Sequence, residues 1–235
     1  MKLMSEKISV VIPTLNSATA LPETLVCLME GLHTGLIQEL IISDAGSLDE
    51  TRQIAEAVGA VFIQGPASRG GQLRRGCAVA KAQWLMVLHA DTHLQGGWTR
   101  VVREHLQLRQ GAAYFRLRFR AAGLLPRLFA KAANLRAGTL GLAYGDQGLL
   151  IRQKDYQRLG GFPDQVLMED VEIMRRIRQA SIGLSELSSD ALTSAERFQK
   201  VGWWRQGGRN VRLLCSYFLG VNPATLAKRY SAPCS

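Results

Sequence analysis

One apolar run constrains the fold more than any other feature of the sequence. Residues 84–88 are apolar throughout, and the run ends in His-Ala-Asp at residues 89–91. Such a run is typical of a strand inside a parallel sheet, because helices cover both of its faces. Two similar runs, at residues 8–13 and 39–43, also end in polar residues. Ligands of open α/β sheets bind at the carboxyl ends of strands, so we expect three strand ends to meet at one crevice.

Helical patterns alternate with these strands over the first 95 residues. Asn16 or Ser17 is expected to cap the first helix, and residues 47–50 have the spacing of a capping box that opens a second helix. This alternation predicts an α/β fold, a mostly parallel central sheet flanked by helices, with a C-terminal helical tail. Residues 112–120 alternate in part, which is typical of a solvent-facing or edge strand.

Chain length and cysteine usage limit the class of protein. With 235 residues, 47% hydrophobic and 20% charged, the chain suits one large α/β domain and shows no signature of disorder. Its four cysteines form neither a C-x-x-C pair nor a zinc-ligand pattern, which predicts reduced thiols and a cytoplasmic protein. We find no signal-peptide pattern and no apolar run of about 18 residues, so we expect neither secretion nor a membrane span.

Positive charge is concentrated in two segments. The formal net charge is +10; residues 100–136 contribute +8 and residues 197–235 contribute +7. Arginine supplies 22 of the 29 cations, which suits bidentate contact with phosphate. The excess predicts either a plain solvated surface or an anionic partner, meaning a phosphate-bearing substrate, lipid headgroups or nucleic acid. No nucleic-acid-binding motif accompanies it, which disfavours nucleic acid.

Acidic residues stand at the ends of predicted elements. Asp44 ends a strand and can accept hydrogen bonds from a base or ribose, or it can only cap the following turn. Asp91 suits Mg²⁺ or Mn²⁺, which prefer one or two carboxylates together with phosphate oxygens, and His93 is a second candidate ligand. Asp170 lies at a predicted helix N-terminus, which favours the ionised form that abstracts a hydroxyl proton, whereas the helix dipole alone explains Glu169.

Two loops bear on phosphate binding. Arg69 and Arg75 flank a glycine pair and can contact a diphosphate, or they can form a solvated helix start. Pro13, Thr14 and Asn16 stand after the first strand where a dinucleotide-binding protein has G-x-G-x-x-G, so a dehydrogenase is disfavoured. A sugar-phosphate nucleotidyltransferase, which needs a glycine-rich basic loop there, is an alternative.

Five short motifs follow one another along the chain. Residues 8–16 form an opening strand, residues 44–51 read D-x-G-S-x-D-x-T, and residues 89–92 read His-Ala-Asp-Thr. Residues 160–162 are Gly-Gly-Phe, and residues 169–170 are Glu-Asp. In this order they resemble the motifs of the family 2 glycosyltransferases, which use nucleotide-diphospho-sugars and have a GT-A fold.

The resemblance narrows to a short bacterial subgroup labelled selenodomain-associated transferase, through residues 89–92, 145–148 and 168–170. It implies an inverting, hexosyltransferase-type enzyme assisted by a divalent cation. It also implies a GT-A domain at 1–200, a nucleotide-binding half at about 1–95, an acceptor half at about 96–200, and a basic amphipathic helical tail at 201–235.

The resemblance also implies roles for single residues. Asp44 would hold the nucleobase, Asp91 the metal and diphosphate, and Asp170 would deprotonate the acceptor hydroxyl. Further contacts to the nucleotide-sugar would come from Pro13, Thr14, Asn16, Arg69, Arg75 and Ala90. The acceptor or sugar side would include Asp146, Gln147, Gly161, Phe162 and Glu169. The first acid of the family's D-x-D motif is His89 here, so only Asp91 carries over as a metal ligand.

The tail has its own pattern. Residues 197–229 contain seven cations and no acid, with Trp203 and Trp204 among them. Aromatic residues beside arginines suit a membrane interface, so we expect peripheral contact with the inner face of the membrane and a hydroxyl acceptor that is lipid-linked. The alternative is a helix packed on the core with its arginines in water. A catalytically silent nucleotide- or membrane-binding protein is the remaining alternative.

Overall fold

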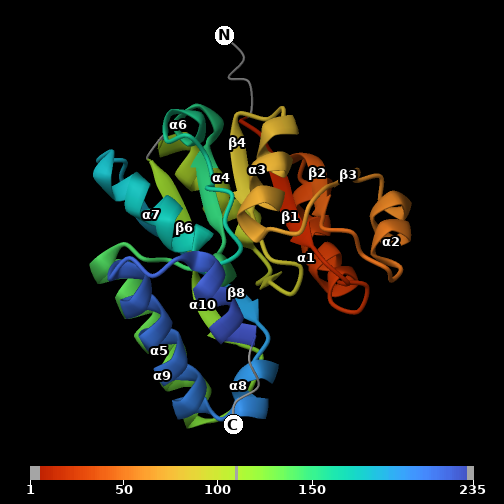
Figure 1. Ribbon diagram of the computed structural model, residues 1–235. Helices are drawn as coiled ribbons and strands as arrows, with labels where there is room; N and C mark the ends of the chain where they lie inside the picture. Colours follow the sequence, from red (N-terminus) through yellow and green to blue (C-terminus); the bar gives the residue numbers. More distant parts are fainter. Residues whose placement is uncertain (1–5, 109–110, 232–235) are drawn as a thin grey trace.

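A mixed sheet runs through the centre of the protein, whose structure is a computed structural model that describes residues 6–108 and 111–231 (Figure 1). Within these residues the sheet has eight strands, in the order β3-β2-β1-β4-β7-β6-β8-β5. The strands are β1 (Ile8–Thr14), β2 (Ile37–Asp44), β3 (Val61–Gln64), β4 (Trp84–Val87), β5 (His93–Leu94), β6 (Ala112–Phe119), β7 (Leu149–Arg152) and β8 (Leu184–Thr193).

The strand directions confirm the mostly parallel sheet. Strands β3, β2, β1 and β4 are parallel neighbours, and β6 is parallel to β8. Strand β7 is antiparallel to β4 and β6, and the short β5 is antiparallel to β8. Because β2, β1 and β4 are adjacent and parallel, their carboxyl ends lie at one edge of the sheet, as the sequence predicts.

Helices cover both faces of this sheet (Figure 1). On one face the core includes Leu25 and Trp98, and on the other it includes Leu73 and Met174. These residues belong to α1 and α4 in the first case and to α3 and α7 in the second. The helices are α1 (Leu21–His33), α2 (Thr51–Ala57), α3 (Arg69–Val79), α4 (Trp98–Leu108), α5 (Leu124–Leu140), the 3₁₀ turn η1 (Gly145–Gln147), α6 (Gln153–Arg158), α7 (Glu169–Gln179), α8 (Glu196–Val201), α9 (Trp203–Phe218) and α10 (Pro223–Ser231).

The predicted cap of α1 is wrong. Ala20 occupies the cap position, and no side chain accepts a hydrogen bond from the first turn. Asn16 instead joins the loop after β2: its backbone N–H donates to Ser47 Oγ at 2.7 Å, and its Oδ1 accepts from the Leu48 N–H at 2.9 Å. The Ser17 N–H donates to Thr51 Oγ1 at 2.9 Å. Asn16 and Ser17 therefore bind the loop after β2 instead of capping α1.

The predicted capping box at residues 47–50 is also wrong. Glu50 is the cap residue of α2, and its side chain caps nothing. The Ser47 hydroxyl donates backward to Asp44, and Asp49 accepts a hydrogen bond from the Ala18 N–H at 2.9 Å. Both polar side chains therefore bind the β1–α1 and β2–α2 loops together at the edge of the sheet.

Strand β6 lies inside the sheet, between β7 and β8, so the edge-strand alternative for residues 112–120 is wrong. Its partial alternation has another cause. Near its end Arg116 and Arg118 point away from the core and pair with Asp190 of β8, at 2.8 and 3.6 Å. Charged side chains on an internal strand are tolerated here because they face solvent and a carboxylate.

The C-terminal helices α8, α9 and α10 pack beside α5 and the end of β6, below the main sheet in Figure 1. A separate aromatic core forms there, in which the ring of Trp203 lies 5.1 Å from that of Phe119 and 4.9 Å from that of Phe198. No helix among the described residues has both the length and the apolar character needed to cross a bilayer.

Candidate active site

Hydrogen bonds join the ends of β1 and β2. The buried Gln72 amide, from α3, donates to the carbonyl oxygens of Thr14 at 2.7 Å and Ser43 at 3.0 Å. Thr14 Oγ1 donates to Asp44 at 2.7 Å, and Asp44 also accepts from the N–H groups of Gly46 and Ser47. The edge of the sheet is thereby held rigid before any ligand arrives.

Asp44 is satisfied by the protein itself. It is 1% exposed. It accepts four hydrogen bonds, from the hydroxyls of Thr14 and Ser47 and from the N–H groups of Gly46 and Ser47. Burial opposes ionisation, but the hydrogen bonds from Ser47, Thr14 and Gly46 lower the pKa of Asp44 below its usual value. The structure thus shows Asp44 organising the loop after β2, and its contact with a nucleobase stays a prediction.

The strand-end cavity, of about 590 Å³, opens at this edge of the sheet. Most of the residues predicted to contact the nucleotide-sugar line it. They are Pro13, Thr14, Asn16, Arg69, Ala90 and Asp91. The Ala90 carbonyl accepts a hydrogen bond from Thr24 of α1 at 2.7 Å, which positions the segment that carries Asp91.

The central cavity, of about 370 Å³, adjoins the strand-end cavity, because Arg69, His89 and Asp91 line both. Its other acids come from distant parts of the chain. They are Asp146 in η1, Glu169 and Asp170 at the start of α7, and Glu196 in α8. Asp91 and Asp170, separated by more than a third of the sequence, therefore face one space, as the sequence predicts.

Asp170 is held at the first turn of α7. Its Oδ2 accepts a hydrogen bond from the Gly145 N–H at 2.9 Å, and its Oδ1 accepts one from the Val171 N–H at 2.7 Å. Met168, which begins the helix, has a φ of 65°, a value that L-residues adopt at a cost. Backbone strain of this kind recurs where a protein fixes functional side chains.

Two of the acids that line the central cavity each have one carboxylate oxygen without a hydrogen-bond partner. Asp146 Oδ1 and Glu169 Oε2 are buried without a hydrogen bond. Burial raises the pKa of Asp146 to about 6; Asp170 and Asp91 add to the rise, and Arg136 opposes it. Burial and the adjacent Asp170 raise the pKa of Glu169, against Arg69, whose Nε lies 3.7 Å from Glu169 Oε1.

His89, which stands where the family has an acid, is a neutral side chain. Burial and, to a smaller extent, the charge of Arg69 lower its pKa to about 3. The ring packs against Gly145 so closely that a Cβ there would lie 2.3 Å from His89 Nε2. Position 145 must therefore be glycine for as long as His89 keeps this place.

The residues around Asp91 fit a divalent cation. No group of three or more His, Cys, Asp or Glu side chains among the described residues could hold a metal ion without help. Mg²⁺ needs no such cage, because one or two carboxylates and substrate phosphates suffice. Asp91 faces both cavities, and the unpartnered Asp146 Oδ1 is a further oxygen donor in the central one.

The structure does not bring His93 to either cavity. Its ring lies 3.1 Å from Arg120 Nη1, and its Nε2 lies 3.6 Å from Glu23 Oε2. Burial lowers its pKa, and Arg120 adds to the effect. The geometry thus places His93 in a polar cluster with Arg120 and Glu23, outside the cavities that Asp91 lines.

Besides His93, five predicted site residues lie outside both cavities: Asp44, whose hydrogen bonds are given above, and Arg75, Gln147, Gly161 and Phe162. Arg75 donates to the Pro66 carbonyl oxygen at 3.0 Å. Gln147 is fully buried, and its amide donates to Phe115 and Asn134, which ties η1 to β6. Gly161 and Phe162 pack against Tyr156, whose hydroxyl accepts from the Phe162 N–H at 3.1 Å.

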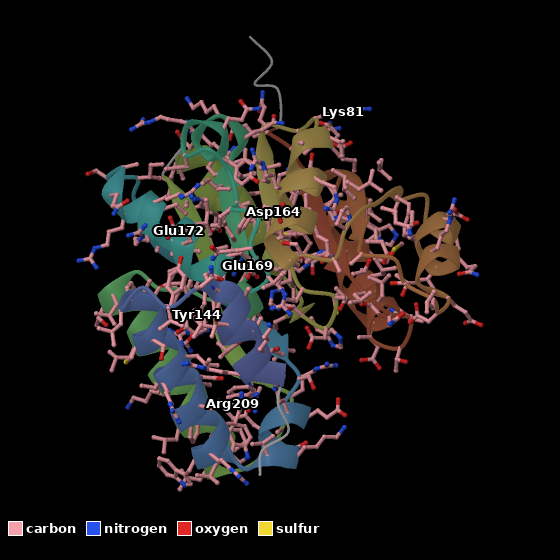
Figure 2. All side chains as sticks on the ribbon, viewed as in Figure 1. Lys81, Tyr144, Asp164, Glu169, Glu172 and Arg209 are labelled. Atoms are coloured by element: carbon pink, nitrogen blue, oxygen red, sulfur yellow. The ribbon has the colours of Figure 1, made fainter. Side chains whose placement is uncertain are left out.

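Sequence reasoning missed the wall that the C-terminal helices add to the central cavity. Gln206 is 1% exposed, donates to Asn210 at 2.8 Å, and leaves its Oε1 without a partner. The guanidinium of Arg197 lies 3.6 Å from the centre of the Tyr230 ring. These residues line the cavity with Asp170. Figure 2 shows Glu169 and Tyr144 near the junction of the sheet and these helices, with Arg209 further along α9.

Solved structures with a similar fold are glycosyltransferases. Glucosyl-3-phosphoglycerate synthase from Mycobacterium tuberculosis, in complex with Mn²⁺, uridine-diphosphate and phosphoglyceric acid, matches with a TM-score of 0.59 at 19% identity, over 80% of this chain and 69% of that one. TarS 1–349 from S. aureus, in complex with UDP, matches with a TM-score of 0.63 at 17% identity, over 83% of this chain and 62% of that one. At these identities the likeness shows the GT-A fold.

The sequence also matches a family model. No curated protein matches the chain. The model for glycosyl transferase family 2 matches residues 9–155, which span β1 to α6 and include the segments that carry Asp44, Asp91 and Asp146. The match is to the broad family, and the narrower subgroup stays a prediction. The chain belongs to glycosyl transferase family 2.

Proposed function

We propose that the protein transfers a hexosyl group from a nucleotide-diphospho-sugar to an acceptor hydroxyl, with inversion at the anomeric carbon. One observation carries the proposal: Asp91 and Asp170 line a single cavity that adjoins the crevice at the ends of β1 and β4. The first residue is suited to the donor's diphosphate, and the second to the acceptor. The Mn²⁺ and UDP named with similar structures support this choice of donor.

The donor would lie along both cavities. Its nucleoside would occupy the strand-end cavity, between the loop after β1 and the start of α3, and its diphosphate would lie beside Asp91 and Arg69, which the two cavities share. A divalent cation at Asp91 would neutralise charge on the departing diphosphate. Arg69 is the arginine that reaches both cavities, so it would stabilise the same charge from the protein side.

The acceptor would lie against Asp170. As its hydroxyl oxygen attacks the anomeric carbon, the hydroxyl proton passes to an Asp170 oxygen and the bond from that carbon to the diphosphate oxygen breaks. One displacement from the opposite face inverts the configuration, and no covalent intermediate on the enzyme is needed. The Gly145 N–H donates a hydrogen bond to Asp170 Oδ2 at 2.9 Å, and this bond holds the carboxylate in position to act as the base.

Nucleotide-dependent thermal stability tests the donor half of the proposal. UDP or GDP with Mn²⁺ should raise the melting temperature, and Asp91→Ala should remove that rise while leaving the unliganded protein folded. Asp155→Ala, on α6 and outside both cavities, is the matched control. A screen of nucleotide-sugars for release of nucleoside diphosphate, with and without Mn²⁺, then tests turnover. A protein that binds nucleotide but never releases diphosphate would be the silent alternative.

A further inference from the structure

Helix α9 has two faces of different character. Its inner face carries the buried Gln206 and Leu213. Its outer face carries exposed apolar residues at helical spacing, and these continue to Leu219 at the end of the helix. Trp204 is 70% exposed and Leu219 is 84% exposed. The outer stripe consists of Trp204, Val211, Cys215, Phe218 and Leu219.

Helix α5 adds to this surface. Leu124, Leu128 and Leu135 recur at spacings of four and seven residues, share one side of the helix, and are exposed. The Trp204 ring packs edge-on against Phe129 of α5, with ring centres 5.4 Å apart. The two helices therefore lie side by side (Figure 1), and each carries an exposed apolar stripe.

The charge around the stripes has one sign. Arg205 and Arg212 border the stripe of α9, and Lys131 lies within that of α5; all three side chains are exposed. Neither helix contains an acid, and the sequence has none from residue 197 to its end. The guanidinium groups of Arg197 and Arg209 contact the Tyr230 ring instead.

We propose that the outer faces of α9 and α5 dock on an anionic bilayer surface. Apolar side chains would enter the interface while arginines and Lys131 contact the headgroups, which is how amphipathic helices bind membranes. A second copy of the chain suits the surface less well, because a symmetric contact would bring these cations against one another. Membrane docking accords with an enzyme that works in the cytoplasm at the inner face of the membrane.

Docking would place the central cavity next to lipid. Asn210 lines that cavity from α9, whose other face would lie on the bilayer. An acceptor hydroxyl carried on a lipid would then be held close to the cavity that contains Asp170, with α9 between the cavity and the bilayer. This consequence rests on the proposed function, whereas docking does not, so vesicle binding and nucleotide binding are measured separately in each variant.

Co-sedimentation of the full chain with vesicles tests the proposal. We expect binding to phosphatidylglycerol-containing vesicles at low salt, loss at high salt, and weak binding to phosphatidylcholine alone. The double variant Arg212→Gln, Lys131→Gln should weaken binding about 30-fold, which is the loss expected for two cations near the bilayer surface. Val211→Ser with Leu219→Ser should weaken it about tenfold or more.

Matched controls lie away from this surface. Lys81→Gln removes a cation at the far end of the molecule from Arg209 (Figure 2), and Val26→Ser removes a 70% exposed apolar side chain from α1. Neither should change vesicle binding, and in every variant UDP with Mn²⁺ should shift the melting temperature as in wild type. No binding to anionic vesicles, or equal losses in the controls, would overturn the proposal. The proposal would also be overturned if sedimentation showed that the protein is a stable dimer and that the Val211→Ser, Leu219→Ser variant is a monomer.

Discussion

Two sides of the crevice treat buried carboxylates in opposite ways. On the β1–β2 side Asp44 accepts four hydrogen bonds, and its pKa is lowered. On the η1–α7 side Asp146 and Glu169 each leave a buried oxygen without a partner, and both have raised pKa values. An unpartnered buried polar atom costs stability, so the second side gives up stability that the first side keeps.

The difference suggests a division of labour. The satisfied side stabilises the fold and presents a preformed edge, because its polar groups are already bound to one another. The unsatisfied side keeps donors and acceptors available for a ligand, as sites do when function competes with stability. The two sides should therefore respond differently to the removal of a carboxylate.

The largest expected effect is on turnover at the unsatisfied side. Asp170→Asn should lower the rate of sugar transfer by about 10²–10⁴-fold, since an amide cannot take the acceptor's proton. The variant should stay folded and keep its response to UDP with Mn²⁺, although its amide can accept only one of the two hydrogen bonds that Asp170 accepts. Steady-state release of nucleoside diphosphate measures the change. Undiminished turnover would refute the assignment of Asp170 as the base.

Removal of the satisfied carboxylate should affect folding instead. Asp44→Ala strands the donors at Gly46, Ser47 and Thr14, so we expect a loss of about 3–5 kcal/mol in the free energy of unfolding. Urea denaturation measures it. Thr14→Val, which deletes one of the four hydrogen bonds, should cost about 1 kcal/mol. A stable Asp44→Ala protein would show that these bonds contribute little and that the two sides do not differ.

The contact between η1 and the end of β4 is testable at Gly145. A methyl group there would lie 2.3 Å from His89 Nε2, so Gly145→Ala should destabilise the protein by about 1–3 kcal/mol through overpacking. His89→Ala should relieve much of that cost in the double variant, although it opens a cavity of its own. Additive losses in this double-mutant cycle would mean that the ring moves aside freely.

The last expected effect is similar in size to that of Gly145→Ala and has the opposite sign. The pKa of Asp146 is about 6 in the folded protein, above its unfolded value near 4, so the folded state binds the extra proton between these values. Stability should fall as the pH rises through this window and stay lower above it. Asp146→Asn should therefore stabilise the protein at pH 8 by roughly 1–3 kcal/mol and have little effect below pH 4. Thermal unfolding at both pH values measures it, and a destabilised variant at pH 8 would contradict the raised pKa.

The parts of the fold that depend on local pattern were predictable. Apolar runs at β1, β2 and β4 are long enough to define buried strands, and those of β1 and β4 end in polar residues that line the crevice. Local pattern failed where a polar side chain had a distant partner, as with Ser47, which binds Asp44 rather than the first turn of α2. Helix caps and loop contacts use the same residue types, and the sequence does not show which partner is nearer.

The candidate site was predictable on its strand-end side and at Asp170, because each residue follows directly from the end or start of an element. Gln147 and Phe162 were not separable from site residues, since their burial depends on what packs over them. Nothing in the sequence indicated that Gln206 would line the central cavity. The basic pattern of the tail predicts either a membrane-facing helix or a helix packed on the core, and the structure shows that one face of α9 packs inward and lines the central cavity.

Hydrophobic periodicity and chain order were enough to establish that this protein is a mostly parallel α/β sheet with carboxylates at one edge, because strands and helices follow from neighbours within a few residues. Long-range packing decided everything else. It determined which carboxylates are satisfied, which glycine touches His89, and that the C-terminal helices wall the central cavity. These properties depend on the burial and hydrogen-bond partners of atoms far apart in the chain, and burial exists only once the tertiary structure has formed.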